Sequence, residues 1–229
     1  MGATTLGRVT DARILSINVG PGVPRRYASG PTTAIDKRPV EIADVRDPGP
    51  KTGGLGSGLV GDEIGDQRHH GGRSQAVYAY AREDLDWWAA ELGRRLPDGM
   101  FGENLTTIGV DCTTARVGEV WRVGSAVLRV EVPRIPCATF AGHMGVRGWV
   151  KRFSEVGRTG AYLSVVEPGR LRTGDEIHVE RPAHDITLLL NFRAAMGDRD
   201  AAERVLDSGV LADEEQEWLA RKVGRPLRQ

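Results

Sequence analysis

The chain has 229 residues, with 31 basic and 31 acidic side chains, so its formal net charge at pH 7 is zero. General nucleic-acid-binding proteins carry a basic surplus, so this balance argues against nucleic acid as a partner but leaves room for a local anion pocket. The length suits one large domain, or one domain with a small appendage.

Export and membrane signals are missing from the sequence pattern. The N-terminus shows no signal-peptide architecture, and no segment reaches the run of about eighteen apolar residues that spans a membrane. Only two cysteines occur, Cys112 and Cys137, which is too few for the disulfide framework of a small secreted protein. We therefore expect a cytoplasmic protein without a membrane partner.

In chain order, the first 180 residues predict short strands around one helix. The strands share compact or alternating apolar residues between turn signals, and they cover 13–19, 33–45 (a strand or hairpin), 75–80, 117–123, 126–132, 161–166 and 176–180. A helix is expected from Glu83 to Leu96, since Leu85, Trp88 and Leu92 recur at helical spacing. Without repeating strand–helix alternation, this pattern predicts a mostly antiparallel barrel or sandwich.

Two further segments differ from this pattern. The glycine-rich segment 47–62 lacks the ending of a phosphate loop, so we interpret it as a surface or lid segment, with phosphate binding as the minor alternative. After Arg181 and Pro182 the spacing becomes helical, over 185–195, 199–207 and 214–223. The expected caps are Asp198 and Asp213 at helix starts, and Gly209 and Gly224 at helix ends.

Cys137 is the first candidate for chemistry. Pro133 and Pro136 restrict the backbone before it, and Arg134 lies three residues upstream. A nearby guanidinium favours the thiolate, which is the form that attacks electrophiles and binds metals. The alternative is a buried cysteine that acts as a small hydrophobic residue. A Cys137–His143 nucleophile and base pair is a weaker hypothesis, because no protease signature surrounds the cysteine.

Three other clusters gather polar groups. The segment Arg68–Arg73 holds two histidines and a Gly-Gly pair, which suits an oxyanion such as phosphate; zinc would need a third ligand, and a polar capping loop is the alternative. Glu103 and Asn104 could contact the edge of a heterocycle or bond to their own turn. Arg158 and Thr159 could bind a phosphate or form a strand-entry turn.

Together and in this order, these clusters resemble a known family. The strings GDEIGDQRHHGGRSQAVYAY, FGENLTT, VGEVWRVGSAVLRVEVPRIPC and GRTGAYLSVVEPGRLRTGDEI are similar to the MOSC domain, named after the C-terminal part of molybdenum cofactor sulfurase. The resemblance covers residues 40 to 181, and the tail resembles the three-helix domain of stand-alone bacterial members. It implies a mainly β, α+β fold: a MOSC-type β-barrel with peripheral helices over 1–182, then a small helical domain over 183–229.

The resemblance also implies a function. Close relatives are molybdoenzymes that reduce N-hydroxylated compounds such as hydroxylaminopurines and amidoximes, with Cys137 matching the molybdenum ligand. Glu103 and Asn104 are expected in the catalytic pocket, with Glu103 a candidate proton donor. The residues expected to hold or frame the molybdopterin cofactor are Arg68, His69, His70, Gly71, Gly72, Phe101, Gly102, Arg134, Arg158 and Thr159.

The remaining expectations concern partners and alternatives. The chain has no flavin, haem or iron–sulfur motif, so a separate flavin- or iron–sulfur-containing reductase would supply electrons. The alternatives are a non-catalytic carrier of the molybdenum cofactor, or a sulfur carrier that holds a persulfide on Cys137. Cys112 lies outside the family pattern; we interpret it as a structural loop residue that could pair with Cys137 under oxidation.

Overall fold

The computed structural model describes residues 12–225, and most of its strands form one curled sheet. The strands of this sheet are β1 (Arg13–Val19), β2 (Arg38–Val40), β4 (Val77–Ala81), β5 (Leu105–Ile108), β6 (Val120–Val123), β7 (Ala126–Pro133), β8 (Ala161–Glu167) and β10 (Ile177–Glu180). Their order across the sheet is β10-β6-β7-β8-β4-β5-β1-β2. A smaller sheet pairs β3 (Ile42–Val45) with β9 (Gly169–Arg172), a strand that the sequence pattern did not predict.

The expected mainly β, α+β class is confirmed, but the sheet does not close into a barrel through a continuous ladder. The segment that leads into β10 meets the start of β1, which lies next to the edge strand β2, through one isolated bridge between Arg13 and Glu176. Three backbone bonds of 2.8 to 2.9 Å accompany the bridge, from Ile177 N to Ala12 O, from Ile14 N to Asp175 O and from Gly174 N to Ile14 O. The physical reason lies in β1, which pairs with β5 and, from Ile17 onward, with β2. Only the first residues of β1 are therefore left for β10.

One pair of neighbouring strands is parallel. β4 and β5 run in the same direction, and the connection between them includes α1 (Arg82–Leu92). The predicted helix is thus confirmed, but it ends four residues early. Gly93 adopts the left-handed conformation, with φ of 62°, and its N–H donates to Ala89 O and Ala90 O. This cap ends the helix before Leu96 is reached.

The predicted hairpin of β6 and β7 leads directly to Cys137. Its turn needs glycine at position 124, where φ is 57° and a Cβ would lie 2.3 Å from Arg170 O. Beyond β7 come two helices that sequence spacing did not predict, α2 (Ala138–Met144) and α3 (Trp149–Val156). Each is short and ends at a left-handed glycine. Their aromatic side chains pack with those of α1 in a cluster of Trp88, Phe101, Phe140, Trp149 and Phe153.

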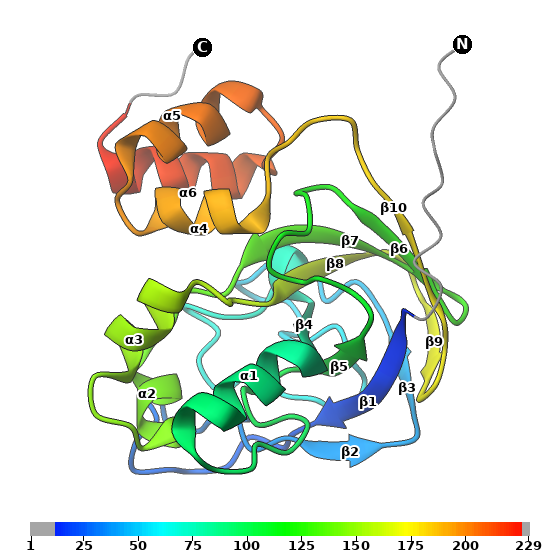
Figure 1. The fold of residues 1–229 in the computed structure, drawn as a ribbon. Helices are drawn as coiled ribbons and strands as arrows, with labels where there is room; N and C mark the ends of the chain where they lie inside the picture. Colours follow the sequence, from blue (N-terminus) through cyan, green and yellow to red (C-terminus); the bar gives the residue numbers. More distant parts are fainter. Residues whose placement is uncertain (1–11, 226–229) are drawn as a thin grey trace.

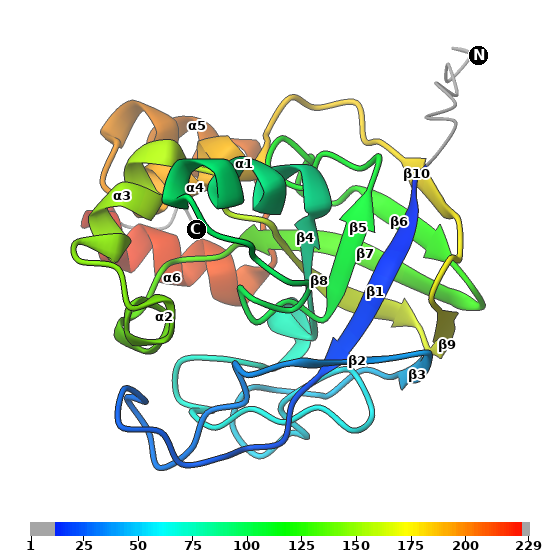
Figure 2. The same cartoon turned by 60° about the horizontal axis from the view of Figure 1, so that its bottom comes forward.

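The three C-terminal helices are confirmed as α4 (Leu188–Ala195), α5 (Arg199–Ser208) and α6 (Asp213–Val223). Asp198 caps α5 as predicted, whereas α6 is capped by Ala212 and not by Asp213. The helices gather at one end of the molecule, where α4 packs against β7 (Figures 1 and 2). Leu188 and Leu219 belong to the same apolar core as Val130 of β7. The division into domains 1–182 and 183–229 stays a prediction.

Across residues 12–225, no helix combines the length and apolar character needed to cross a membrane.

Candidate active site

Cys137 lies in the connection between β7 and α2. Its backbone is extended, with φ of −122° and ψ of 171°, and its carbonyl accepts the N–H of Ala141 at 3.0 Å as α2 begins. The preceding prolines, Pro133 and Pro136, are buried and restrict this approach. The side chain is thereby presented at the end of a rigid strand, where it is partly exposed.

Two cavities meet at Cys137. The larger holds about 570 Å³ and lies between the connection after β7, the loop that carries His70, and the helices α4 and α6. The smaller holds about 90 Å³. Both are lined by the same five residues, Ser29, Asp66, His70, Cys137 and Tyr162. A volume of several hundred cubic ångströms is typical of small-molecule sites.

Arg134 places a positive charge beside the thiol. Its side chain is 6% exposed, donates a hydrogen bond to Phe101 O, and lies 4.1 Å from the ring centre of Phe140. Within residues 12–225 none of its hydrogen bonds or ion pairs reaches a carboxylate. Burial opposes the charged form, but Tyr78, Tyr162 and Cys137 outweigh it and raise the pKa of Arg134 above its ordinary value.

The interaction that raises the pKa of Arg134 lowers the pKa of the Cys137 thiol. Burial alone would raise the pKa of Cys137, but a hydrogen bond with the His70 side chain and the charge of Arg134 outweigh it. The pKa of Cys137 falls from the ordinary 9.0 to about 6. The sulfur is therefore mostly thiolate at neutral pH, as the sequence position of Arg134 suggested.

The histidine–glycine segment splits into residues that face the cavity and residues that pack loops. His69 and His70 line the larger cavity, and His69 also forms an ion pair of 2.9 Å with Asp66. Arg68 is exposed and lines neither cavity. A Cβ on Gly71 would lie 2.8 Å from Gly56 O, and one on Gly72 the same distance from Lys51 N. These two glycines therefore allow neighbouring loops, and not a ligand, to pack closely against this segment.

This loop packing brings two residues into the cavity wall that sequence reasoning missed, Lys51 and Gln75. Lys51 is the lysine of the glycine-rich segment 47–62, and its positive charge was the feature of that segment that could have indicated an anion site. Gln75 ends the short 3-10 helix η1 (Arg73–Gln75). Its Oε1 atom is buried and has no hydrogen-bond partner in the structure. The wall therefore offers both a cation and an unused acceptor.

Glu103 and Asn104 point into the protein and line neither cavity. Glu103 is fully buried and accepts hydrogen bonds from Gly99 N at 2.6 Å and Phe101 N at 2.9 Å. Burial raises its pKa to about 7 despite these bonds. Asn104 accepts from Tyr78 N at 3.0 Å. Their catalytic roles stay predictions; the contacts show that they brace the loop whose Phe101 carbonyl holds Arg134.

Of the other residues expected at the cofactor, Gly102 lies at the cavities, whereas Phe101, Arg158 and Thr159 do not line them. Gly102 lines the smaller cavity, whereas Phe101 sits in the aromatic cluster. Arg158 forms an ion pair with Asp84 and lines a separate hollow. Thr159 is fully buried, and its carbonyl accepts the Tyr78 hydroxyl at 2.8 Å. The structure therefore does not bring Arg158 and Thr159 to the cavities at Cys137.

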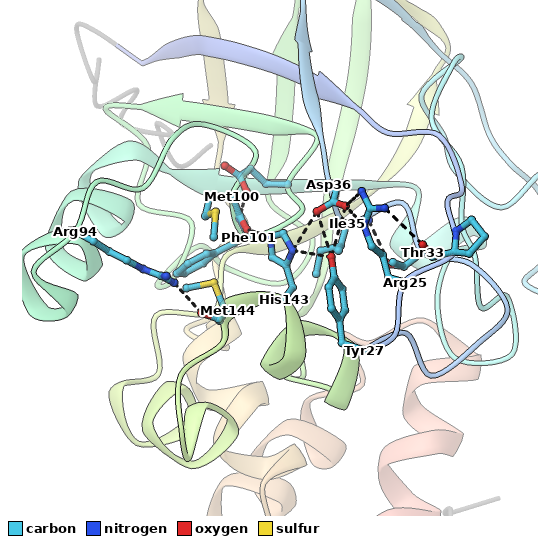
Figure 3. A network of polar contacts seen from close by, with 12 residues as sticks. Arg25, Tyr27, Thr33, Ile35, Asp36, Arg94, Met100, Phe101, His143 and Met144 are labelled. Carbon is cyan, nitrogen blue, oxygen red and sulfur yellow. Dashed lines mark hydrogen bonds and ion pairs between the residues drawn. The ribbon is translucent and has the colours of Figure 1, made fainter.

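A polar network centred on His143 ties α2 to the segment around Asp36 and to the Met100 backbone. Figure 3 shows Arg25, Tyr27 and Asp36 converging with His143 from one side and the Met100 backbone from the other. The His143 Nδ1 atom lies 3.3 Å from the Tyr27 hydroxyl and 3.2 Å from Asp36, and Nε2 lies 3.0 Å from Met100 O. Burial lowers the pKa of His143. Both ring nitrogens thus have partners other than Cys137, which does not support the nucleophile and base pair.

A hydrogen bond from the Ser29 backbone to α2 fixes one residue that the two cavities share. Ser29, which lines both cavities, is held by Thr139 of α2, whose Oγ1 accepts the Ser29 N–H at 2.9 Å.

Cys112 is fully buried in the apolar core beside Thr107, and burial raises its thiol pKa. Both cysteines are free, and Cys112 has the structural position that its sequence context suggested.

The sequence matches one family model and is similar to several known proteins. A family model described as the MOSC domain matches residues 66–178. The YflK protein of Bacillus subtilis is 31% identical over 219 residues, which cover 93% of this chain and 96% of the relative. A protein of Gibberella moniliformis named reductase is 33% identical over 132 residues, which cover 55% of this chain and 23% of the relative.

The fold agrees with a solved structure. The crystal structure of YiiM from Geobacillus stearothermophilus superposes with a TM-score of 0.72, at 24% sequence identity, over 93% of this chain and 99% of that one. The superposition extends over the curled sheet and the C-terminal helices, because nearly the whole of both chains is covered. The arrangement that surrounds the cavities is therefore a shared fold.

Proposed function

The chain belongs to the MOSC domain family, and we propose that it binds the molybdenum cofactor through Cys137 and reduces N-hydroxylated compounds. The observation that carries the proposal is the low-pKa thiol of Cys137 at the meeting point of two cavities. A thiolate is a soft donor suited to a redox metal. The relative named reductase supports an oxidoreductase as the general class.

The residues of the larger cavity fit such a cofactor. The unpartnered Oε1 of Gln75 offers an acceptor to the N–H groups that a pterin carries, and Lys51, His69 and His70 offer donors to its phosphate. Within residues 12–225 no group of three His, Cys, Asp or Glu side chains could hold an ion by itself. Among the described residues, Cys137 would then hold the metal as the single protein ligand, and the cofactor itself would have to supply the other donors.

When bound, the cofactor would supply the two electrons that, with two protons from solvent, reduce an N–OH group to the amine and water. The chain's own residues hold and surround that centre. His70 and Arg134 keep the Cys137 sulfur ionised, so it binds a metal without first losing a proton. Pro133, Ile135 and Pro136 form an apolar wall beside the thiol, which limits water there. Electrons would come from a separate flavin- or iron–sulfur-containing reductase.

Turnover of N-hydroxylated substrates tests the proposal. Protein from a cofactor-competent host is supplied with a chemical electron donor, and the amines formed from 6-hydroxylaminopurine and benzamidoxime are measured. Wild type and Cys112→Ala should both form amine, because Cys112 lies in the core away from the cavities. Folded Cys137→Ala should not. Amine formation by Cys137→Ala, or none by molybdenum-containing wild type, would contradict the reductase proposal.

The same low-pKa thiol also suits a sulfur carrier, because a thiolate attacks the outer sulfur of a donor persulfide, takes up that sulfur and releases the donor as a thiolate. Intact mass of the purified protein separates the two proposals. A mass gain of one sulfur atom that reductant removes, without bound pterin, would favour the sulfur carrier. Tight binding of the cofactor without amine formation would favour the carrier of the molybdenum cofactor.

A further inference from the structure

Helix α6 forms part of the wall of the larger cavity, which Cys137 also lines. Four of its charged residues line that cavity, namely Glu214, Glu215, Glu217 and Arg221. The Ser74 hydroxyl, next to Gln75 in η1, donates to Glu215 at 2.6 Å and ties this helix to the loop side of the cavity. The C-terminal helices thus complete the cavity.

The polar groups that line the cavity come from two parts of the chain, the loops around His70 and helix α6. The loop side contributes the ammonium group of Lys51 and the imidazole rings of His69 and His70, together with the carboxylate of Asp66, which hydrogen-bonds with His69 at 2.9 Å. The α6 side contributes three carboxylates against one guanidinium. A ligand with an anionic end and a donor-rich end would bind with its anionic end toward the loops and its donors toward α6.

Trp218 adds an aromatic surface to the α6 side. Its side chain is 39% exposed and lines the larger cavity. The exposed large hydrophobic residues in the described chain are Ile42, Leu55, Val60, Val150, Val166, Met196 and Trp218. Trp218 is the only aromatic member of that set and the only member in the lining of this cavity. An indole in such a position is a surface on which a planar ligand stacks.

Helix stability alone does not account for this wall. Glu214 lies in the first turn of α6, where negative charge favours the helix terminus. Glu217 lies beyond that turn, and its pairing with Arg221 at 3.7 Å joins two exposed side chains, which contributes little stability. On the same helix, the Lys222 ammonium lies 4.9 Å from the centre of the Trp218 ring, so this indole already contacts one cation, as it would a positively charged ligand.

We propose that α6 is a recognition wall that selects planar, positively charged or N–H-rich ligands and disfavours anionic ones, with Trp218 stacking on the ring and Glu214 and Glu217 receiving the donors. The proposal rests on the proposed function in one respect: the loop part of this cavity would hold the cofactor, and the part lined by α6 would be the substrate site. It gives the C-terminal helices a direct part in binding.

Binding of two rings of opposite charge tests the wall without any turnover. Benzamidine and benzoate are both planar, and their dissociation constants for the full-length protein are measured by calorimetry. Benzamidine should bind more tightly than benzoate. The Glu214→Gln/Glu217→Gln variant should weaken benzamidine about three- to tenfold and reduce the preference. Glu155→Gln, which removes a carboxylate from a comparable exposed i,i+4 pair on α3, should bind like wild type.

Trp218 is tested separately. Trp218→Leu should weaken benzamidine about threefold or more, and Trp218→Phe should restore most of the affinity, because the ring surface is kept. Benzoate binding as tight as benzamidine, no binding of benzamidine, or wild-type affinity in the double variant and in Trp218→Leu would overturn the wall. Neither ligand is reduced, so these results test binding alone and need no turnover.

Discussion

The low pKa of Cys137 depends on its hydrogen bond with His70 and on the charge of Arg134, so replacing Arg134 with Met should raise the thiol pKa toward its ordinary value. The guanidinium is buried and, within the described chain, its hydrogen bonds and ion pairs include no carboxylate, so the sulfur is its nearest ionisable acid besides two tyrosines. Methionine keeps an unbranched side chain of similar length but has no charge. The thiolate then loses the attraction that opposes its burial.

The size of the effect follows from the pKa of about 6 against an ordinary 9.0. That difference corresponds to about 4 kcal/mol in favour of the thiolate. At pH 7 about nine-tenths of the sulfur is ionised. Loss of an adjacent opposite charge raises a pKa by about one to three units, so the ionised fraction in Arg134→Met falls to between about one half and one hundredth. Alkylation at pH 7 should slow by about twofold to about ninetyfold.

Alkylation of cofactor-free protein by iodoacetamide, followed by mass spectrometry between pH 4 and 10, gives the pKa directly. Cys112 is fully buried and serves as the unreactive reference within the same chain. Arg134→Lys keeps a positive charge and should keep most of the reactivity, which separates charge from packing. A wild-type profile centred near pH 9, or identical profiles for wild type and a folded Arg134→Met, would refute the reasoning.

Two stability predictions follow from the loops around the thiol. Glu103 has a folded pKa of about 7 against an ordinary 4.5, so the folded state favours the protonated form of this side chain. The free energy of unfolding is therefore highest below about pH 4.5 and falls by about 3 kcal/mol as the pH rises to about 7. Urea unfolding should show this pH dependence in wild type, and Glu103→Gln should lack it; equal slopes would rule it out. Alanine normally stabilises a helix by about 1 kcal/mol over glycine, but a Cβ on Gly142 would lie 2.3 Å from the Tyr27 Cβ. Gly142→Ala should therefore unfold at lower urea than wild type, and an unchanged or higher midpoint would count against the packing described for α2.

Local signals account for what the sequence predicted well. The β6–β7 hairpin is specified by alternating apolar residues around Gly124, and the ends of α5 and α6 by Gly209 and Gly224. The helices α2 and α3 were missed because each spans only about two turns between glycines, too short for a helical period to stand out. The incomplete closure of the sheet depends on competition for the edge of β1, which is a long-range property.

The candidate site shows the same division. The low pKa of Cys137 was suggested by the proximity of Arg134 in sequence, because three residues keep the two side chains near each other. The direction of Glu103, which points inward, is set by backbone N–H groups that a motif does not reveal. The contribution of α6 to the cavity joins residues more than 70 positions away from Cys137, and no local pattern encodes such a contact.

The central claim is that Cys137 is the molybdenum ligand, and the metal and pterin content of the purified protein tests it most directly. Wild type and Cys137→Ala are produced in the same cofactor-competent host, and each is checked for folding. The account predicts near-stoichiometric molybdenum and pterin in wild type and their loss in the folded variant. Equal molybdenum in both proteins, or none in well-folded wild type despite ample cofactor supply, would contradict it.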